Sequence, residues 1–323
     1  MKLITEVSLP DYPFRIDHHS PLLLMGSCFT ENIGRLMERS FFHTCINPFG
    51  VIYNPLSVMR GLDALLNREA YRERDLREHN GLWFSFDHYT GFSSPDREEC
   101  LERINRIFLH AKQLLRQARV LIISWGTSWM YRYRETGEVV CNCHKIPADR
   151  FIRSRLSPAD ITEVYESLLF RLFGISPDMK ILLTVSPVRH WKDGAHGNQL
   201  SKASLLLAAE SLTDRFPERA FYFPSYEIIM DELRDYRFYS DDMLHINELA
   251  TSYLWEKFLQ TLVSDESCQI IREVDPLLRL IEHRPRRETG KEFRELQKKK
   301  EELLSELKKK YTFLSWNNLD NYK

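Results

Sequence analysis

Short apolar runs alternate along this chain with longer segments in which apolar residues recur every three or four positions. An uninterrupted apolar run bounded by turn residues is typical of a strand buried on both faces, whereas the longer repeat indicates an amphipathic helix. Five runs predict strands, at residues 22–25, 41–46, 120–125, 180–185 and 220–223. Helices are predicted between them, at 29–37, 54–66, 101–115, from 157 onwards, 200–216 and 246–262. This alternation predicts an α/β fold, a mostly parallel sheet of about five strands with helices on both faces.

Polar and small residues follow the ends of these strands. In a parallel sheet all strands end at one edge, so residues that follow different strands meet there although they are distant in the sequence. The residues expected at this edge are Ser27, Asn47, Gly50, Gly126, Thr127, Ser186, Arg189 and the loop with Asp242 and His245. The edge is therefore the predicted functional site.

Two other segments have distinct character. Residues 71–95 are rich in aromatic and polar groups and are expected to form a long surface excursion. Residues 284–311 are highly charged, with an apolar stripe at helical spacing, so we expect a domain at 1–283 and an amphipathic helical extension at 284–323. That helix is expected to pack on the domain or on a second copy of the chain, giving a possible homo-oligomer. A solvated tail is the next alternative, and a nucleic-acid arm is the least favoured because glutamates interrupt the lysines.

Composition narrows the possible partners. The chain has 323 residues and a net charge of -1, which favours neither nucleic acid nor an anionic membrane surface as a partner. No apolar run approaches the roughly 20 residues of a membrane span, and the start turns polar too soon for a secretory signal. The six cysteines are scattered along the chain, which indicates reduced thiols. We therefore expect a soluble, cytoplasmic protein.

Gly26 and Ser27 lie between the end of the first predicted strand and the start of a helix. Helix amino termini favour developing negative charge, so a serine there suits a nucleophile. It equally suits a plain serine cap of the helix. A nucleophilic serine needs an imidazole to take its proton and a carboxylate to orient the imidazole. Asp242 and His245 can supply both from one short segment, or can be an exposed aspartate beside a histidine that caps the next helix.

Six ordered motifs together resemble the GSCFA family, which in turn is similar to the wider SGNH/GDSL hydrolases and to polysaccharide O-acetyl esterases and transferases. The resemblance runs from about residue 22 to residue 258. It implies a three-layer, flavodoxin-like sheet with Ser27 as nucleophile and His245 as base, supported by Asp242. The motifs are Gly26-Ser27-Cys28-Phe29, Asn47-Pro48-Phe49-Gly50, Gly126-Thr127-Ser128-Trp129, Asn142-Cys143-His144-Lys145, Thr184-Val185-Ser186-Pro187-Val188-Arg189 and Asp242-Met243-Leu244-His245.

Two positions depart from these patterns. The wider superfamily usually has Gly-x-Asn-Asp after the third strand, and its asparagine amide helps to bind the oxyanion, but this chain has Gly126-Thr127-Ser128-Trp129. A hydroxyl or backbone amide must replace that donor, so the tentative oxyanion residues are Asn47, Gly50, Gly126 and Thr127. Thr30 replaces the alanine of the family's first motif and is small enough for the turn.

Further polar residues are candidates for substrate contacts. Asn142, His144 and Lys145 are expected to bind substrate or to order their loop. Arg189 is expected to bind a carboxylate or a sugar hydroxyl, with a surface ion pair as the alternative.

Metal and thiol chemistry are the remaining possibilities. Cys141, Cys143 and His144 suggest a metal site, but zinc usually needs four ligands in paired spacings and no second pair follows, so no metal or other cofactor is expected. Cys28 is a rival nucleophile, but adjacent side chains at such a turn point apart, and we expect it to pack beneath the edge.

These observations predict a serine esterase or acyltransferase that acts on O-acyl groups, expected to be O-acetyl groups, of a carbohydrate or similar polar substrate. One alternative is a non-catalytic binding or scaffolding protein with a hydrolase frame, which the missing asparagine and the charged terminal helix favour. Another is a thiol enzyme that depends on Cys28.

Overall fold

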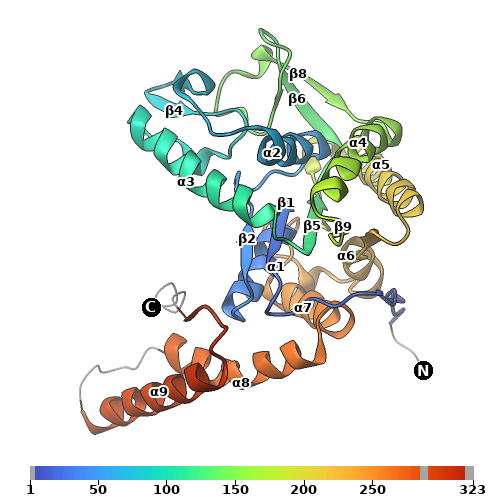
Figure 1. Cartoon of the computed structure of the whole chain (residues 1–323). Coiled ribbons are helices and arrows are strands. Elements are labelled where there is room, and N and C mark those ends of the chain that lie inside the picture. Colours follow the sequence, from blue (N-terminus) through green and yellow to red (C-terminus); the bar gives the residue numbers. More distant parts are fainter. Residues whose placement is uncertain (1–3, 284–289, 317–323) are drawn as a thin grey trace.

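The computed structural model describes residues 4–283 and 290–316 (Figure 1). Within them the main sheet has five parallel strands in the order β10-β9-β5-β1-β2. Counted along the chain this is the order 2-1-3-4-5 of flavodoxin-like folds, so the predicted fold class is confirmed. The strands are β1 (Leu22–Gly26), β2 (Thr44–Ile46), β5 (Val120–Trp125), β9 (Lys180–Val185) and β10 (Ala220–Tyr222).

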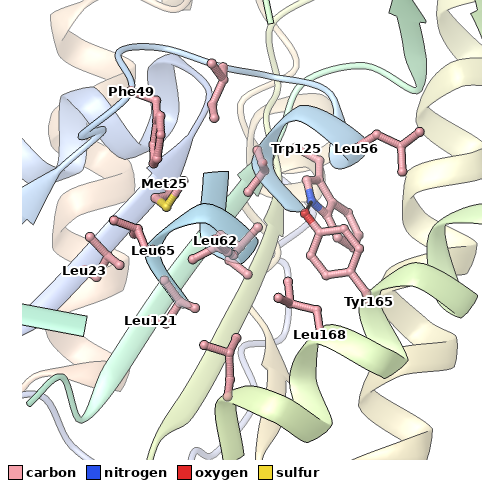
Figure 2. Close-up of a cluster of buried hydrophobic side chains, with 14 of the residues drawn as sticks. Leu23, Met25, Phe49, Leu56, Leu62, Leu65, Leu121, Trp125, Tyr165 and Leu168 are labelled. Carbon is pink, nitrogen blue, oxygen red and sulfur yellow. Dashed lines mark hydrogen bonds between the residues drawn. The ribbon is translucent and has the colours of Figure 1, made fainter. Parts of the chain in front are cut away.

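Helices cover both faces of this sheet because alternate residues of each strand point to opposite sides. In β1, Leu23 and Met25 face one core and Leu22 and Leu24 face the other. Figure 2 shows Leu23 and Met25 in the first of these cores. The first face is covered by α2 (Pro55–Asn67), α3 (Arg97–Leu115), α4 (Pro158–Ile175) and α5 (Gly194–Arg215), and the second by α1 (Cys28–Arg39) and α7 (Glu248–Leu262).

Polar side chains fix where several helices begin. Ser27, Asn54, Asp96, Ser157 and Asn247 each accept a hydrogen bond from a backbone amide in the first turn of the helix that follows. Such caps satisfy amides that have no partner within the helix. The helices predicted to begin at about residues 54 and 157 do begin there.

The expectation of a surface excursion at residues 71–95 is wrong. This segment contains the hairpin β3 (Arg77–His79) and β4 (Leu82–Phe84), and its Phe84 and Phe86 are buried. They pack against a second, antiparallel sheet of β7 (Val139–Val140), β6 (Trp129–Tyr133) and β8 (Phe151–Arg155), which the hydrophobic pattern did not predict. Aromatic side chains from the two insertions thus bury each other, although each insertion alone is too polar to indicate a core.

Helices α8 (Asp265–Glu282) and α9 (Lys291–Lys310) form a hairpin that extends away from the sheet (Figure 1). Val274 and Leu277 of α8 pack with Leu307 and Tyr311, and Phe41 of the domain joins this cluster. The charged helix expected at 284–311 is thus helical over 291–310 and packs on α8, while 284–289 lie outside the described residues. Pairing with a second copy stays a prediction.

Short helical turns complete the described chain. They are η1 (Glu73–Asp75), η2 (Thr90–Phe92), η3 (Ala148–Arg150), η4 (Trp191–Asp193), α6 (Ser225–Glu227), η5 (Ile228–Glu232) and η6 (Tyr236–Phe238). Across 4–283 and 290–316, none of the helices combines the length and apolar character that crossing a membrane requires.

Candidate active site

Ser27 lies where β1 ends and α1 begins. Gly26 has a φ of +143°, and a Cβ there would lie 2.0 Å from the Ser124 carbonyl oxygen, so the turn requires glycine. Ser27 caps α1 and accepts a hydrogen bond from the Phe29 amide at 3.3 Å. Its Oγ is also 2.7 Å from Ser124 Oγ on β5, and Ser27 is only 3% exposed. The serine is therefore both a helix cap and part of a hydroxyl pair at the sheet edge.

Asp242 and His245 form a hydrogen-bonded pair in the loop before α7. The imidazole Nδ1 lies 2.6 Å from Asp242 Oδ2, while Asp242 Oδ1 accepts the amides of Leu244 and His245 at 2.9 Å each. Hydrogen bonds from the amide and ring of His245, with that from Leu244, lower the pKa of the Asp242 carboxyl to about 2. A carboxylate at this distance favours the tautomer with a proton on Nδ1, which leaves Nε2 able to accept one.

Ser27 and His245 are not hydrogen-bonded to each other in this structure. The surroundings of His190, which follows β9, indicate where the Ser27 turn and the His245 loop lie relative to each other. Its Nε2 lies 3.0 Å from where a Cβ of Gly126 would be, and Gly126 follows the strand that pairs with β1. Burial, the charge of Lys202 and the nearby His245 lower the pKa of His190 to about 3, so this ring is neutral. His190 therefore lies near both the Gly126 loop and the Asp242–His245 loop.

The backbone amides proposed for the oxyanion site already have partners. The Gly50 amide donates to the Asn47 carbonyl at 2.7 Å, and the amides of Gly126 and Thr127 donate to the Tyr53 carbonyl at 2.7 and 3.1 Å. The Thr127 hydroxyl lies 3.0 Å from Ser201 Oγ. The three backbone amides can bind an oxyanion only if their present hydrogen bonds break.

Asn47 has a free donor beside the serine turn. Its Oδ1 accepts the Gly26 amide at 2.9 Å and the Thr30 hydroxyl at 3.1 Å. Its Nδ2 is buried and has no hydrogen-bond partner among the described residues. A buried unpaired donor is costly unless something uses it, and Asn47 has such a donor, whereas the other tentative oxyanion amides are already paired.

A buried lysine, which the sequence reasoning missed, ties the ends of β5 and β9 together. Lys202 of α5 is 1% exposed and donates to the carbonyls of Gly126 at 2.6 Å and Ser186 at 2.5 Å. Burial and the charge of Arg189 lower the pKa of its amine to about 7. The sequence spacing could have indicated this burial, because Lys202 lies on the same helix face as the buried Leu205 and Leu212.

In the loop with Asn142, His144 and Lys145, the polar side chains of Asn142 and His144 form hydrogen bonds within the protein. The Asn142 side chain accepts the His144 amide at 2.8 Å, and His144 and Lys145 both have positive φ. His144 Nε2 donates to the carbonyls of Ser85 and His88, each at 3.1 Å, and its ring stacks on Phe84. These contacts agree with the alternative that the residues order their loop, whereas substrate contact stays a prediction.

The six cysteines are free in the structure. Within the described ranges no group of three or more histidine, cysteine, aspartate or glutamate side chains has an arrangement that could hold a metal ion. Cys28 is half-buried, and burial together with the nearby Glu31 raises the pKa of its thiol. A raised pKa reduces the thiolate fraction and makes Cys28 a weaker nucleophile than an ordinary cysteine.

Two solved structures resemble this chain distantly. One is a family 3 carbohydrate esterase of Clostridium thermocellum, with 10% identity, a TM-score of 0.36 and coverage of 79% of this chain and 98% of the esterase. The other is an acetyl xylan esterase from the rumen bacterium Butyrivibrio proteoclasticus, with 11% identity, a TM-score of 0.32 and coverage of 78% of this chain and 64% of the esterase. Similarity this low transfers neither fold nor activity.

No curated protein matches the chain. The model of the GSCFA family matches residues 21–258, which include the Gly26-Ser27 turn, the strand ends and the Asp242–His245 loop. This match covers well over half of the sequence and agrees with the family predicted from the six motifs. The chain therefore belongs to the GSCFA family.

Proposed function

We propose that this protein is a serine esterase or acyltransferase that acts on O-acyl groups, with O-acetyl groups of a carbohydrate or similar polar molecule as the leading substrate. The observation that carries the proposal is the Asp242–His245 pair, whose Nδ1 to Oδ2 distance of 2.6 Å leaves an imidazole nitrogen free to act as a base. The position of Ser27 supports the proposal, because this serine directly follows β1 at the carboxyl edge of the main sheet.

In the proposed first step Ser27 Oγ attacks the ester carbonyl carbon while Nε2 of His245 takes the hydroxyl proton. The carbonyl oxygen becomes an oxyanion, which the Asn47 amide would stabilise. The tetrahedral intermediate then collapses, the bond to the leaving alkoxide breaks, and His245 returns the proton to that oxygen. Water or another hydroxyl resolves the acyl-enzyme by the same sequence in reverse, giving hydrolysis or transfer.

This mechanism requires Ser27 to exchange its hydroxyl partner. Ser27 Oγ now pairs with Ser124 Oγ at 2.7 Å, so it must rotate toward His245, or the loop before α7 must approach, when substrate binds. Catalytic hydrogen bonds are often long or absent without substrate and form in the complex. Asp242 and His245 are each about half exposed, so their loop is less constrained by packing than the strands.

The alternative, a non-catalytic binding protein, has a specific observation in its favour. Ser27 is 3% exposed, and its hydroxyl is already used in capping α1 and in pairing with Ser124. A serine with only a structural role would have these features. The two hypotheses differ in whether the Ser27 hydroxyl reacts with an electrophile.

The test combines p-nitrophenyl acetate turnover with fluorophosphonate labelling and peptide mapping. We expect the label on Ser27, with labelling and turnover lost in Ser27→Ala and reduced about 100-fold or more in His245→Gln. Ser124→Ala is the matched control, because it removes the neighbouring hydroxyl but leaves the nucleophile and the base. Cys28→Ala should retain activity, which separates the serine mechanism from the thiol mechanism.

Full retention of turnover and labelling in Ser27→Ala would refute the assignment. No turnover and no label in the unchanged protein would favour the non-catalytic hypothesis. Activity that survives Ser27→Ala but is blocked by iodoacetamide would assign the reaction to Cys28.

A further inference from the structure

A cavity of about 490 Å³ lies beside the Asp242–His245 loop. It is bounded by the segment after β9, which contributes Arg189 and Trp191, and by residues of η5, η6 and the Asp242 loop, among them Tyr236 and Tyr239. Its volume is within the range of small-molecule binding sites in proteins. Asp242 is part of its lining, so a molecule bound there would lie beside the residue that is hydrogen-bonded to His245.

Arg189 contributes a positive charge that the rest of the described chain does not pair. Its Nε is buried and has no hydrogen-bond partner, and none of the ion pairs formed by the described residues includes its guanidinium. Its guanidinium lies over the ring of Trp191, 5.6 Å from the ring centre. Its backbone amide donates to the Leu244 carbonyl at 3.4 Å, which ties Arg189 to the Asp242 loop.

The remaining charged residues of the lining do have partners. Within the described residues they are Asp242 with His245 at 2.6 Å, Asp235 with Arg237 at 2.9 Å, and Arg234 with Asp231 at 3.3 Å. Arg189 is therefore the one charged residue of this lining without a hydrogen-bonded or ion-paired partner among the described residues, and its guanidinium is partly desolvated. Burying part of a guanidinium without an anion is unfavourable, so an anion supplied by a ligand would be bound strongly there.

We propose that this cavity binds a carboxylate-bearing saccharide, whose carboxylate pairs with Arg189 and whose ring packs on the exposed aromatic side chains. Trp191 is 52% exposed and Tyr236 is 75% exposed, and both line the cavity. Exposed aromatic faces suit the apolar faces of sugar rings. This inference rests on the proposed function and specifies its substrate class as an acylated acidic saccharide.

The charges favour a carboxylate over a phosphate monoester. A carboxylate carries one negative charge, which matches the single guanidinium of the lining that has no partner. A phosphate monoester carries close to two at neutral pH, and the second would lie near the carboxylates of Asp235 and Asp242.

The test is isothermal titration calorimetry at low ionic strength with two trisaccharides of the same linkage. Trigalacturonic acid carries the carboxylates, and the corresponding neutral galactose trisaccharide does not. We expect the unchanged protein to bind the acid at least tenfold more tightly. Arg189→Met should abolish this preference, because a charge-assisted pair contributes roughly 10- to 100-fold in affinity. Arg189→Lys should keep part of it.

Arg171→Met is the matched control, because Arg171 is on α4, outside the cavity. It should bind like the unchanged protein. Equal binding of the acidic and neutral trisaccharides, no binding of the acid at millimolar concentration, or an undiminished preference in Arg189→Met would each overturn the proposal. The first two comparisons use the unchanged protein and so do not depend on how any variant folds.

Ser27→Ala separates this proposal from the proposed reaction. It should bind trigalacturonic acid as tightly as the unchanged protein, because Ser27 is not part of the cavity lining. If the preference for acid is present but fluorophosphonate does not label Ser27, the saccharide site stands and the esterase assignment fails.

Discussion

The buried amine of Lys202 should make the stability of this protein depend on pH in a measurable way. Burial, reinforced by the charge of Arg189, lowers its pKa from 10.5 to about 7. A difference of about 3.5 units corresponds to about 5 kcal/mol at most, since each unit is worth about 1.4 kcal/mol. Lys202→Met keeps a side chain of similar length and removes the titrating group.

The sign follows from proton binding. Between pH 7 and 10.5 the unfolded chain keeps the Lys202 proton and the folded chain loses it, so the unfolded state binds more protons. The free energy of unfolding must therefore rise with pH in this window, and the contribution of Lys202 amounts to about 2 kcal/mol between pH 7 and 9. Below pH 7 both states are protonated, and the full penalty of burying the ammonium remains.

The assay is urea unfolding followed by circular dichroism at pH 7, 8 and 9, with reductant present to prevent oxidation of the six free cysteines. The quantity compared is the change in unfolding free energy with pH for Lys202→Met and for the unchanged protein. The unchanged protein should gain about 2 kcal/mol more than the variant. Lys180→Met is the control, because Lys180 also donates to a backbone carbonyl but is exposed at its amine end.

Parallel pH profiles for the unchanged protein and Lys202→Met would refute the reasoning. They would mean that the carbonyls of Gly126 and Ser186 keep the amine protonated in spite of its burial. The result bears on the candidate site, since these carbonyls belong to the residues that directly follow β5 and β9.

Three further predictions concern the site and its support. Gly26→Ala should destabilise the protein by several kcal/mol in thermal unfolding, because a Cβ there would lie 2.0 Å from a backbone oxygen. The control Gly81→Ala, whose Cβ would have nothing within 4 Å, should cost about 1–2 kcal/mol for its positive φ alone. Equal losses in the two variants would contradict this prediction. His88→Phe should raise the free energy of unfolding by about 1 kcal/mol, because both ring nitrogens are buried without a partner among the described residues. A marked loss of stability in chemical denaturation would instead show that the nitrogens form hydrogen bonds. Asp242→Asn should lower kcat for p-nitrophenyl acetate about 10²- to 10⁴-fold, because an amide stabilises neither the required tautomer nor the charged form of His245, and an unchanged kcat would exclude the orienting role.

The main sheet could be predicted from the sequence because its strands are buried on both faces. Such strands are apolar at every position, as in residues 120–123, and the helices between them begin at recognisable caps. The second sheet could not be predicted in this way. Its strand Trp129–Tyr133 is only partly buried, and what buries Phe86 and Phe151 is their contact with each other across two insertions that are distant in the sequence.

The candidate site was predictable to a similar depth. Gly26-Ser27 and Asp242-x-x-His245 are local patterns, and each forms the turn or the pair that its spacing indicates. Contacts between elements were not predictable. The hydroxyl pair of Ser27 with Ser124 depends on strand register, and the use of the Gly126 amide by the Tyr53 carbonyl depends on how the chain before α2 crosses the edge.

The hairpin of α8 and α9 affects how this protein can be divided for experiments. A chain that stopped at residue 283 would keep α8 but lose the helix that covers Val274 and Leu277. It would also uncover Phe41, which belongs to the same cluster although it precedes β2. Removing the charged tail alone would thus expose an apolar surface near the first strands, which would favour aggregation. Aggregation of such a truncated protein would therefore not test the proposed catalytic activity. Expression of the whole chain is the safer basis for assays.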